Sequence, residues 1–426
     1  MRDKVSLCLA LVILTLIYSA SFLGQSVLAQ SSDRENPRSR DLGPTLKRIN
    51  SDAKKKARIE ADQKEDKERA PDEEDVVRVD TSLVVCDVLV MDKQGKPVQG
   101  LTQSDFIVTE DNKQQEIGIF SLGDDAAIPR SIVLIIDYSG SLSPYIQMSV
   151  EAAKELVDKL GPRDTMAIVA DDLSLLADFK GDKAELKQTL ESLKEKAKGK
   201  AARHGWYEGH SLQFSALLAT LREMFDDEDV RPIIIFQTDG DELEILPPVK
   251  EPYYAAIARP FSLKDVYAEV ERSRATIYSV IPGVRFAGLS EHEQLKQAKK
   301  YLMSEPKNDP NVISKMWERG TLSGSARTLI EKRLRWQLAV AGAAELTGGL
   351  TEFLEDPLQA TEIYSHILSG INRRYVMGYY PTNQEHDGKR RTVRIEVRGK
   401  PEYIIWGRKS YYARGQENRQ RLRLNR

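Results

Sequence analysis

The sequence predicts an α/β fold, in which a doubly wound, mostly parallel sheet is accompanied by an antiparallel β module formed from the N- and C-terminal flanks. Two uninterrupted apolar runs, residues 132–136 and 233–236, each end abruptly in a polar cluster. Such runs are typical of strands buried on both faces. Between residues 131 and 371, predicted strands alternate with stretches of helical periodicity, which indicates βα units and a parallel sheet.

The elements of the central domain, residues 131–371, follow one another in order. The predicted strands cover residues 132–136, 165–170, 173–179 at an edge, 231–237 and 275–281. The predicted helices cover residues 145–160, 183–197, 212–225, 263–273, 327–346 and 357–371, where apolar residues recur at helical spacing. The fifth helix ends at paired glycines, Gly348 and Gly349, which act as a C-cap.

Residues 283–325 break this rhythm, because they are polar and are punctuated by proline and glycine. We expect an insertion there, on a lateral face or on the face away from the polar clusters.

The flanks on both sides of this domain are rich in β-branched and aromatic residues, as strands tend to be. The N-terminal β module spans residues 76–125, and the C-terminal β strands lie within residues 372–413. Predicted strands cover residues 76–79, 83–90, 106–110, 116–120, 374–380, 391–398 and 402–412. The strands at 106–110 and 116–120 are expected to pair around a turn at residues 111–113 in one small antiparallel sheet. The aromatic strand 375–380 is more typical of cross-strand packing than of carbohydrate binding.

The N-terminus has the pattern of a secretory signal peptide, residues 1–29. A charged start precedes the uncharged stretch 5–23, and Val27 to Ala29 supply the small or neutral residues that favour cleavage after Ala29. An uncleaved membrane anchor is the alternative, because the apolar stretch is long enough to span a bilayer. Cleavage would leave Cys86 as the sole cysteine and exclude an intramolecular disulfide. The signal predicts a secreted, periplasmic or envelope-associated protein.

Charge and composition set further bounds. Residues 30–75 form a charged linker predicted to be disordered, since they offer too little apolar surface to offset the entropy of ordering. A partly helical charged arm is the alternative, because alanine, lysine and glutamate are good helix formers. Residues 414–426 form a basic tail, also predicted to be disordered. The 426 residues carry a formal net charge of only −2, which argues against a nucleic-acid binder that neutralises phosphates.

Three loops are expected to meet at the carboxyl edge of the sheet, where open α/β sheets bind ligands. Asp137, Ser139 and Ser141 follow the first buried strand, and Asp239 follows the second. Ser211 precedes a predicted helix, where its hydroxyl can cap the backbone and still face the same point. Carboxylates and hydroxyls are oxygen ligands that suit a hard divalent cation.

Each cluster also has a purely local explanation. Aspartate and serine dominate turns, so the first cluster could be a capped turn between a strand and a helix. Asp239 could belong to a T-D-G turn beside a solvent-facing acidic patch with Asp241 and Glu242. The recurrence of an aspartate at two equivalent strand ends favours the metal site.

At these residues the chain resembles a von Willebrand factor type A (VWA) domain with a metal-ion-dependent adhesion site. The D-x-S-x-S pattern of that family matches Asp137, Ser139 and Ser141; its later threonine aligns with Ser211, and its later aspartate with Asp239. The resemblance implies a Rossmann-like fold in which these five residues hold Mg²⁺, with Mn²⁺ or Ca²⁺ as alternatives. It also implies that an aspartate or glutamate of a protein partner completes the coordination of the cation.

The flanks resemble those of a secreted bacterial VWA-related family first named from Acidobacteria. The upstream similarity lies in residues 90–111, and the downstream similarity in residues 347–349, 375–381, 387–390 and 411–413. The resemblance therefore extends over residues 76–413.

The expected function is metal-dependent protein binding of the adhesion type, without catalysis. A nucleophile elbow would need a glycine two residues before the serine, where Ser139 has Asp137. Aspartyl phosphotransferases place a second aspartate where this chain has Ser139, and no general base lies at a recognisable spacing. The alternative from another class is a structural or assembly factor of the cell envelope that acts through its β module.

Overall fold

The computed structural model describes residues 44–48, 83–123, 129–204, 211–225, 230–242, 245–246, 261–304 and 308–413. All of them belong to one compact unit, Gly43–Arg426. The predicted signal peptide, the basic tail, most of the charged linker and the strand expected at residues 76–79 lie outside the described residues. None of the helices in the described ranges is both long and apolar enough to cross a membrane.

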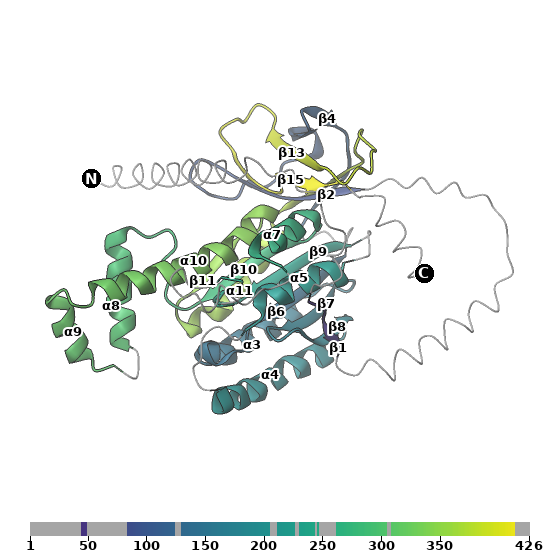
Figure 1. Ribbon diagram of the computed structural model, residues 1–426. Helices are drawn as coiled ribbons and strands as arrows, with labels where there is room; N and C mark the ends of the chain where they lie inside the picture. The colour runs from purple at the N-terminus through teal and green to yellow at the C-terminus, as the bar shows by residue number, and fades with distance from the viewer. Residues whose placement is uncertain are drawn as a thin grey trace, which may run out of the picture. The chain divides into compact units, whose positions relative to one another are not determined.

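A seven-stranded sheet forms the centre of the α/β domain (Figure 1). Its strands, in spatial order, are β1 (Lys47–Arg48), β8 (Ser174–Lys180), β7 (Thr165–Ala170), β6 (Arg130–Ile136), β9 (Arg231–Gln237), β10 (Thr276–Pro282) and β11 (Thr351–Leu354). The five strands from β7 to β11 in this order are parallel, whereas β8 is antiparallel to β7. The mostly parallel sheet predicted from the sequence is confirmed.

Helices cover both faces of this sheet. The helices on one face are α3 (Ser143–Asp158), α4 (Lys183–His204) and α11 (Ala360–Asn372). Those on the other face are α5 (Gln213–Glu223), α7 (Leu263–Arg272) and α10 (Ser323–Thr347). Alternate residues of β6 enter opposite clusters, with Leu134 in the first and Val133 and Ile135 in the second. The continuous apolar run is therefore a strand buried on both faces, where each large aliphatic side chain contributes about 1.5–3 kcal/mol.

One edge of the sheet differs from the prediction. Strand β8 is not the edge, because β1 pairs with it in parallel from the stretch predicted to be a disordered linker. Leu46, one of the few apolar residues in that charged stretch, is only 8% exposed and joins the core. The prediction of disorder is wrong for residues 44–48. Strand β11 was also missed, because four residues are too short to establish a period.

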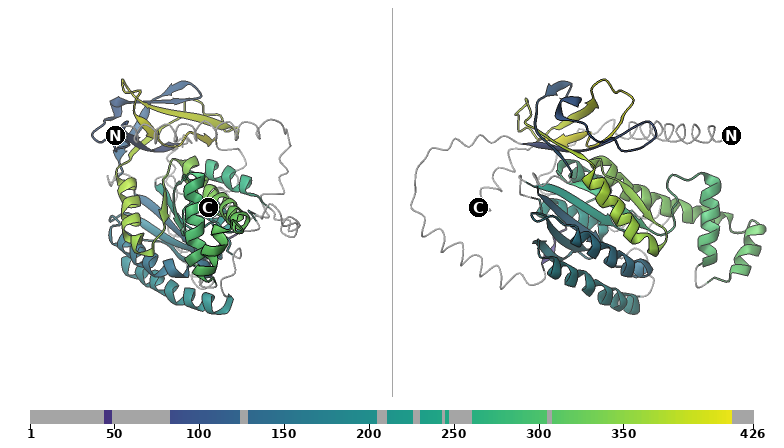
Figure 2. Two further views of the ribbon diagram at one scale, coloured as in Figure 1. Left: turned by 90° about the vertical axis from the view of Figure 1, so that its left-hand side faces the viewer. Right: turned by 180° about the vertical axis from the view of Figure 1, so that it is seen from behind.

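The insertion contains two helices, α8 (Glu291–Ser304) and α9 (Pro310–Glu318), which lie beside the start of α10 (Figure 2). Phe286, Ala298, Ala326 and Ile330 form a small buried cluster between the insertion and α10. Because the chain leaves β10 at its carboxyl end, the insertion begins at the edge where the polar clusters lie. Of the two placements predicted for the insertion, the one on the face away from the polar clusters is therefore wrong.

The glycines after α10 behave as predicted. Gly348 caps the helix in the left-handed conformation with φ of 77°. At Gly349, a Cβ atom would lie 1.7 Å from the carbonyl oxygen of Ile277, so only glycine fits beside β10.

The flanking strands form two antiparallel sheets. One has the order β14 (Ile404–Trp406), β2 (Val84–Met91), β12 (Tyr375–Tyr379) and β5 (Ile117–Leu122); the other has the order β15 (Ser410–Tyr412), β13 (Arg390–Val397), β3 (Phe106–Glu110) and β4 (Lys113–Gln115). Both sheets contribute to one buried cluster, in which the Phe106 and Tyr375 rings lie 5.1 Å apart. The origin of the module in both flanks is confirmed.

The single sheet predicted for the module is wrong. Asp111 and Asn112 both have positive φ, which makes a tight hairpin and brings β4 directly onto β3. The chain then crosses to the other sheet, where β5 pairs with β12.

The β module joins the α/β domain at the amino ends of the parallel strands. Arg231, the first residue of β9, is 2% exposed and donates from Nε to Asp87 of β2 at 2.9 Å. Its two terminal nitrogens donate to the carbonyl oxygens of Gly123 and Ile371, both at 3.1 Å. Thr276 of β10 also donates to Asp87 at 3.0 Å. The opposite, carboxyl edge of the sheet is therefore left for the candidate site.

Candidate metal centre

Strand β6 delivers Asp137 to the carboxyl edge of the sheet. The backbone N–H of Asp137 still donates to the carbonyl oxygen of Gln237 in β9 at 3.0 Å, so the last hydrogen bond between the two strands fixes its position. The Ser139 N–H donates to the Asp137 carboxylate at 2.9 Å, and the Ser139 and Ser141 hydroxyl oxygens lie 3.0 Å apart. The D-x-S-x-S loop thus folds back over its own aspartate, which is 1% exposed.

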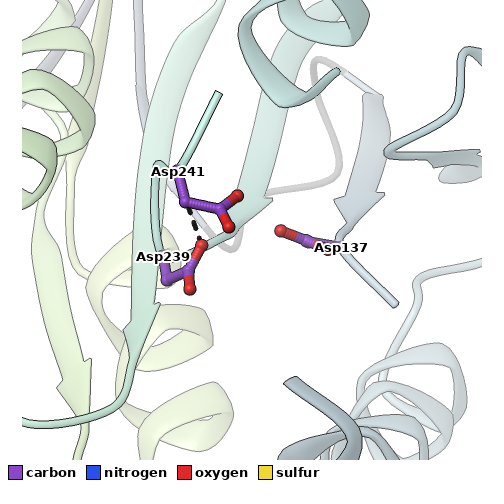
Figure 3. Close-up of side chains that lie close together, drawn as sticks. All are labelled: Asp137, Asp239 and Asp241. Atoms are coloured by element: carbon purple, nitrogen blue, oxygen red, sulfur yellow. Dashed lines mark hydrogen bonds between the residues drawn. The ribbon is translucent and has the colours of Figure 1, made fainter. Parts of the chain in front are cut away.

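Strand β9 delivers two further carboxylates through a tight turn. Gly240 has φ of 81°, and a Cβ atom there would lie 2.8 Å from Val340 Cγ2, so the turn requires glycine. The turn carries Asp239 and Asp241 to the same point as Asp137 (Figure 3). Each aspartate offers one oxygen, and these three oxygens all lie within 4.8 Å of one another.

Asp241 and Glu242 are buried, each 1% exposed, so the alternative of a solvent-facing acidic patch is wrong. Asp241 was not predicted as part of the site; the signal was a second acidic residue two positions after Asp239. Glu242 accepts hydrogen bonds from the N–H groups of Phe214 and Ser215 at 2.6 and 3.2 Å. It therefore caps α5, whose N-cap position holds Leu212, a residue without a capping group.

The start of α5 brings Gln213 into the site. Its Nε2 donates to Asp137 at 3.0 Å and to Asp241 at 2.7 Å, which holds the two loops together. Ser211 is 3% exposed and lies two residues before Gln213. Among the described residues, no hydrogen bond links the Ser211 hydroxyl to the three carboxylates. Its role as a ligand stays a prediction, whereas the contribution of Gln213 was missed.

Burial raises the pKa values of Asp137 and Asp239, and the nearby Asp241 carboxylate raises both further. Arg333 of α10 opposes this for Asp239, since its Nη1 lies 3.3 Å from the Asp239 carboxylate. The Arg333 guanidinium lies 5.2 Å from the Trp336 ring and 5.8 Å from the ring of Tyr301, in the insertion. The insertion thus contacts the Arg333 guanidinium, a positively charged group beside Asp239 that the sequence pattern did not reveal.

These residues fit a hard divalent cation. Three buried carboxylates that share so little space repel one another when ionised, and a dication would relieve that repulsion. The donors are all oxygen atoms, which Mg²⁺, Mn²⁺ and Ca²⁺ prefer. Asp137, Asp239 and Asp241 would hold the cation directly, with the Ser139 and Ser141 hydroxyls beside them.

No protein-family model matches the sequence, and no curated protein matches it. Among solved structures, the chain is similar to the von Willebrand factor domain of the type V pili tip protein Mfa5 from Porphyromonas gingivalis. The identity is 12%, the TM-score is 0.34, and the match covers 58% of this chain and 96% of that one. It is also similar to the manganese-loaded TRAP protein of Plasmodium vivax, with 12% identity, a TM-score of 0.30 and coverage of 69% and 84%.

A third similar structure is proximal thread matrix protein 1 from the mussel byssus, with 14% identity and a TM-score of 0.30. The match covers 57% of this chain and 48% of that one, so the chain spans about half of its length. The assignment of a ligand depends on the geometry of the site itself.

The fold and the site together define a class of protein. It is a doubly wound α/β domain with a buried, oxygen-rich acidic centre at the carboxyl edge of its sheet. A β sandwich made from its own flanks is attached at the opposite edge.

Proposed function

We propose that this chain is a metal-dependent protein-binding protein of the adhesion type. A divalent cation, Mg²⁺ with Mn²⁺ or Ca²⁺ as alternatives, would be held by Asp137, Ser139, Ser141, Ser211 and Asp239, joined by Asp241. The observation that carries the proposal is the convergence of three buried carboxylates within 4.8 Å, beside two serine hydroxyls.

The partner in this proposal supplies an aspartate or glutamate to the cation. Mg²⁺ requires about six oxygen ligands and usually keeps some positions for water or for groups of another molecule. A partner carboxylate can take such a position, and the adjacent Arg333 guanidinium favours a negatively charged group there. The proposal assigns binding alone to the site, with no reaction performed on the partner.

Calorimetric titration of the purified protein with Mn²⁺ tests cation binding. The wild type should bind one equivalent, and Asp137→Ala should abolish binding. Asp158→Asn is the matched control, because that carboxylate is 58% exposed on α3. Equal binding by wild type and Asp137→Ala would contradict the site.

Partner binding is tested by a pull-down from envelope extract with and without EDTA. Proteins retained only in the presence of the cation, and lost with Asp137→Ala, are the expected outcome. If the same proteins are retained in the presence of EDTA and by Asp137→Ala, the adhesion mechanism is contradicted.

The place of action in this proposal is outside the cytoplasm, either secreted or associated with the envelope. It is supported by the charged start and apolar stretch at residues 1–29. Fractionation and mass spectrometry of the mature N-terminus test it, and a cytoplasmic protein that starts at Met1 would contradict it.

A second candidate function is a structural or assembly factor that acts through the β module. It is supported by Ile404 and Trp406, which are 46% and 39% exposed on β14, the outer strand of one sheet of the module. Exposed apolar side chains on an outer strand are suited to pairing with another chain. Trp406→Ala should then abolish partner retention while Asp137→Ala leaves it unchanged; the adhesion mechanism requires the reverse.

A further inference from the structure

Residues 44–48, here called the N-terminal strap, lie as an added strand on the outer edge of the sheet (Figure 1). Strand β1 runs parallel to β8, with Lys47 opposite Ser174 and Arg48 opposite Leu175. The Lys47 N–H donates to the carbonyl oxygen of Leu173 at 2.7 Å. The strap therefore binds the edge of β8 as an extended peptide does in β-strand addition.

The edge of β8 has chemistry that suits the strap. The Leu46 side chain enters the buried cluster that contains Leu173 and Leu175, and its N–H donates to Glu223 of α5 at 3.0 Å. The Lys47 ammonium donates to the carbonyl oxygen of Asp172 at 3.0 Å. Arg48 pairs with Asp178 at 3.4 Å, in a contact exposed enough to contribute little. An extended segment with one apolar residue followed by two basic residues thus fits this edge.

The segment before β8 also makes hydrogen bonds to the D-x-S-x-S loop and to the residue after Ser211. The segment from Asp171 to Leu173 joins β7 to β8, and Leu173 has φ of 69°, which is uncommon for a leucine. Tyr138, between Asp137 and Ser139, donates from its hydroxyl to the Asp172 carboxylate at 2.9 Å. Its backbone N–H donates to the Asp171 carboxylate at 3.4 Å.

The other loop is attached to the same segment. The N–H of Leu212, the residue after Ser211, donates to the carbonyl oxygen of Asp171 at 2.9 Å. The strap therefore bonds to Asp172 and Leu173, which belong to the segment that fixes both the D-x-S-x-S loop and the loop of Ser211. Glu223, which accepts from Leu46, ends the helix that starts with Gln213.

We propose that the edge of β8 is an acceptor site for an extended apolar–basic–basic peptide, and that its occupancy by the strap holds the two metal-binding loops in place. The effect on metal affinity rests on the proposed cation site, whereas peptide binding does not. Loss of residues that orient metal ligands typically lowers metal affinity about 10–100-fold. The loss of affinity on release of the strap should lie at the lower end of this range, because the metal ligands themselves stay intact.

The test uses the full chain with Leu46→Asp and Lys47→Glu combined, which removes the apolar contact and reverses one charge. Mn²⁺ affinity measured by calorimetry should fall about tenfold. A synthetic peptide of residues 43–50, added in trans at millimolar concentration, should restore it. A peptide with aspartate in place of its leucine should not. Arg394→Ala, which removes a positive charge from an exposed side chain of the β module, is the control and should leave the affinity unchanged.

Hydrogen exchange of β8 shows whether the strap has been released. If β8 exchanges faster in the variant while Mn²⁺ affinity equals that of the wild type, the coupling is overturned. If the double variant fails to fold, Lys47→Pro serves instead, because it removes the N–H that donates to Leu173 and the ammonium that donates to Asp172 but keeps the Leu46 side chain. The same fall and rescue are then expected.

Fluorescence anisotropy of the labelled peptide on the double variant separates this inference from the proposed function. Leucine-dependent binding supports the acceptor site even if the wild type binds no Mn²⁺, an outcome that would remove the proposed function alone. Absence of peptide binding to a folded variant would overturn the acceptor site.

Discussion

The change of Asp241 to asparagine should have opposite effects on the cation-free and cation-bound protein. Asparagine preserves the shape of the side chain and an oxygen that accepts from Gln213, but it removes one of three buried negative charges. Two unit charges 4.8 Å apart repel each other by about 3 kcal/mol at an effective dielectric constant near 20. Because the pKa values of Asp137 and Asp239 are already raised, protonation relieves part of this repulsion.

Without cation, Asp241→Asn should therefore stabilise the protein by about 1–3 kcal/mol, or roughly 2–6 °C in melting temperature. The variant should also bind the cation less tightly than the wild type does. At a cation concentration 100 times the wild-type dissociation constant, binding stabilises the wild type by about 2.7 kcal/mol. A tenfold weaker variant would gain only about 1.4 kcal/mol.

Thermal melts with EDTA and with Mg²⁺, on the wild type and the variant, measure both effects. Asp158→Asn is again the exposed control and should change neither melting temperature by more than about one degree. A lower melting temperature of Asp241→Asn in EDTA, or a gain from Mg²⁺ equal to that of the wild type, would refute the electrostatic argument.

Three further predictions concern the rest of the molecule. Arg231→Ala should lower the free energy of unfolding by about 3–5 kcal/mol in urea titrations, because it leaves Asp87 buried without its charge partner; the exposed Arg394→Ala should have little effect. The stabilisation by Mg²⁺ should grow as pH rises above the ordinary aspartate range. Because the pKa values of Asp137 and Asp239 are raised, the folded, cation-free protein binds more protons there than the unfolded chain does, so its stability falls as pH rises. The cation must displace these protons, so it binds more tightly at higher pH. Melts across pH 4–8 with and without Mg²⁺ measure the stabilisation, and a difference that stays constant with pH would contradict the prediction. Cys86, whose pKa is raised to about 12 by burial, should resist thiol reagents at pH 8 in a Cys8→Ser chain until denaturant unfolds the protein, and rapid labelling of the native chain would contradict its burial.

Regular elements were predictable where the pattern of the sequence is long. Strand β9 was predicted with its observed bounds, and the glycine cap after α10 was predicted at the residue that adopts the left-handed conformation. Short elements were not. Strand β11 has four residues and β1 has two, which is too few for any period to stand out.

The candidate site was predictable in part for a similar reason. Asp137 and Asp239 end long buried strands, and the carboxyl ends of parallel strands meet at one edge, so their proximity follows from the pattern. Asp241 and Gln213 depend on the direction in which a loop turns. That direction is set by Gly240 against Val340 and by Glu242 at the start of α5, which are contacts between distant segments.

By itself, the amino-acid sequence determined the fold class, the edge of the sheet at which polar side chains gather, and the origin of the β module in both flanks. Those features follow from local periodicity and from the geometry of parallel strands. Only the tertiary structure decided which carboxylates are buried together, that Arg333 and the insertion flank them, and that a five-residue strap lies on the edge of β8. The physical reason is that burial and charge pairing arise from residues far apart in the chain, whose contacts leave no repeating pattern in the sequence.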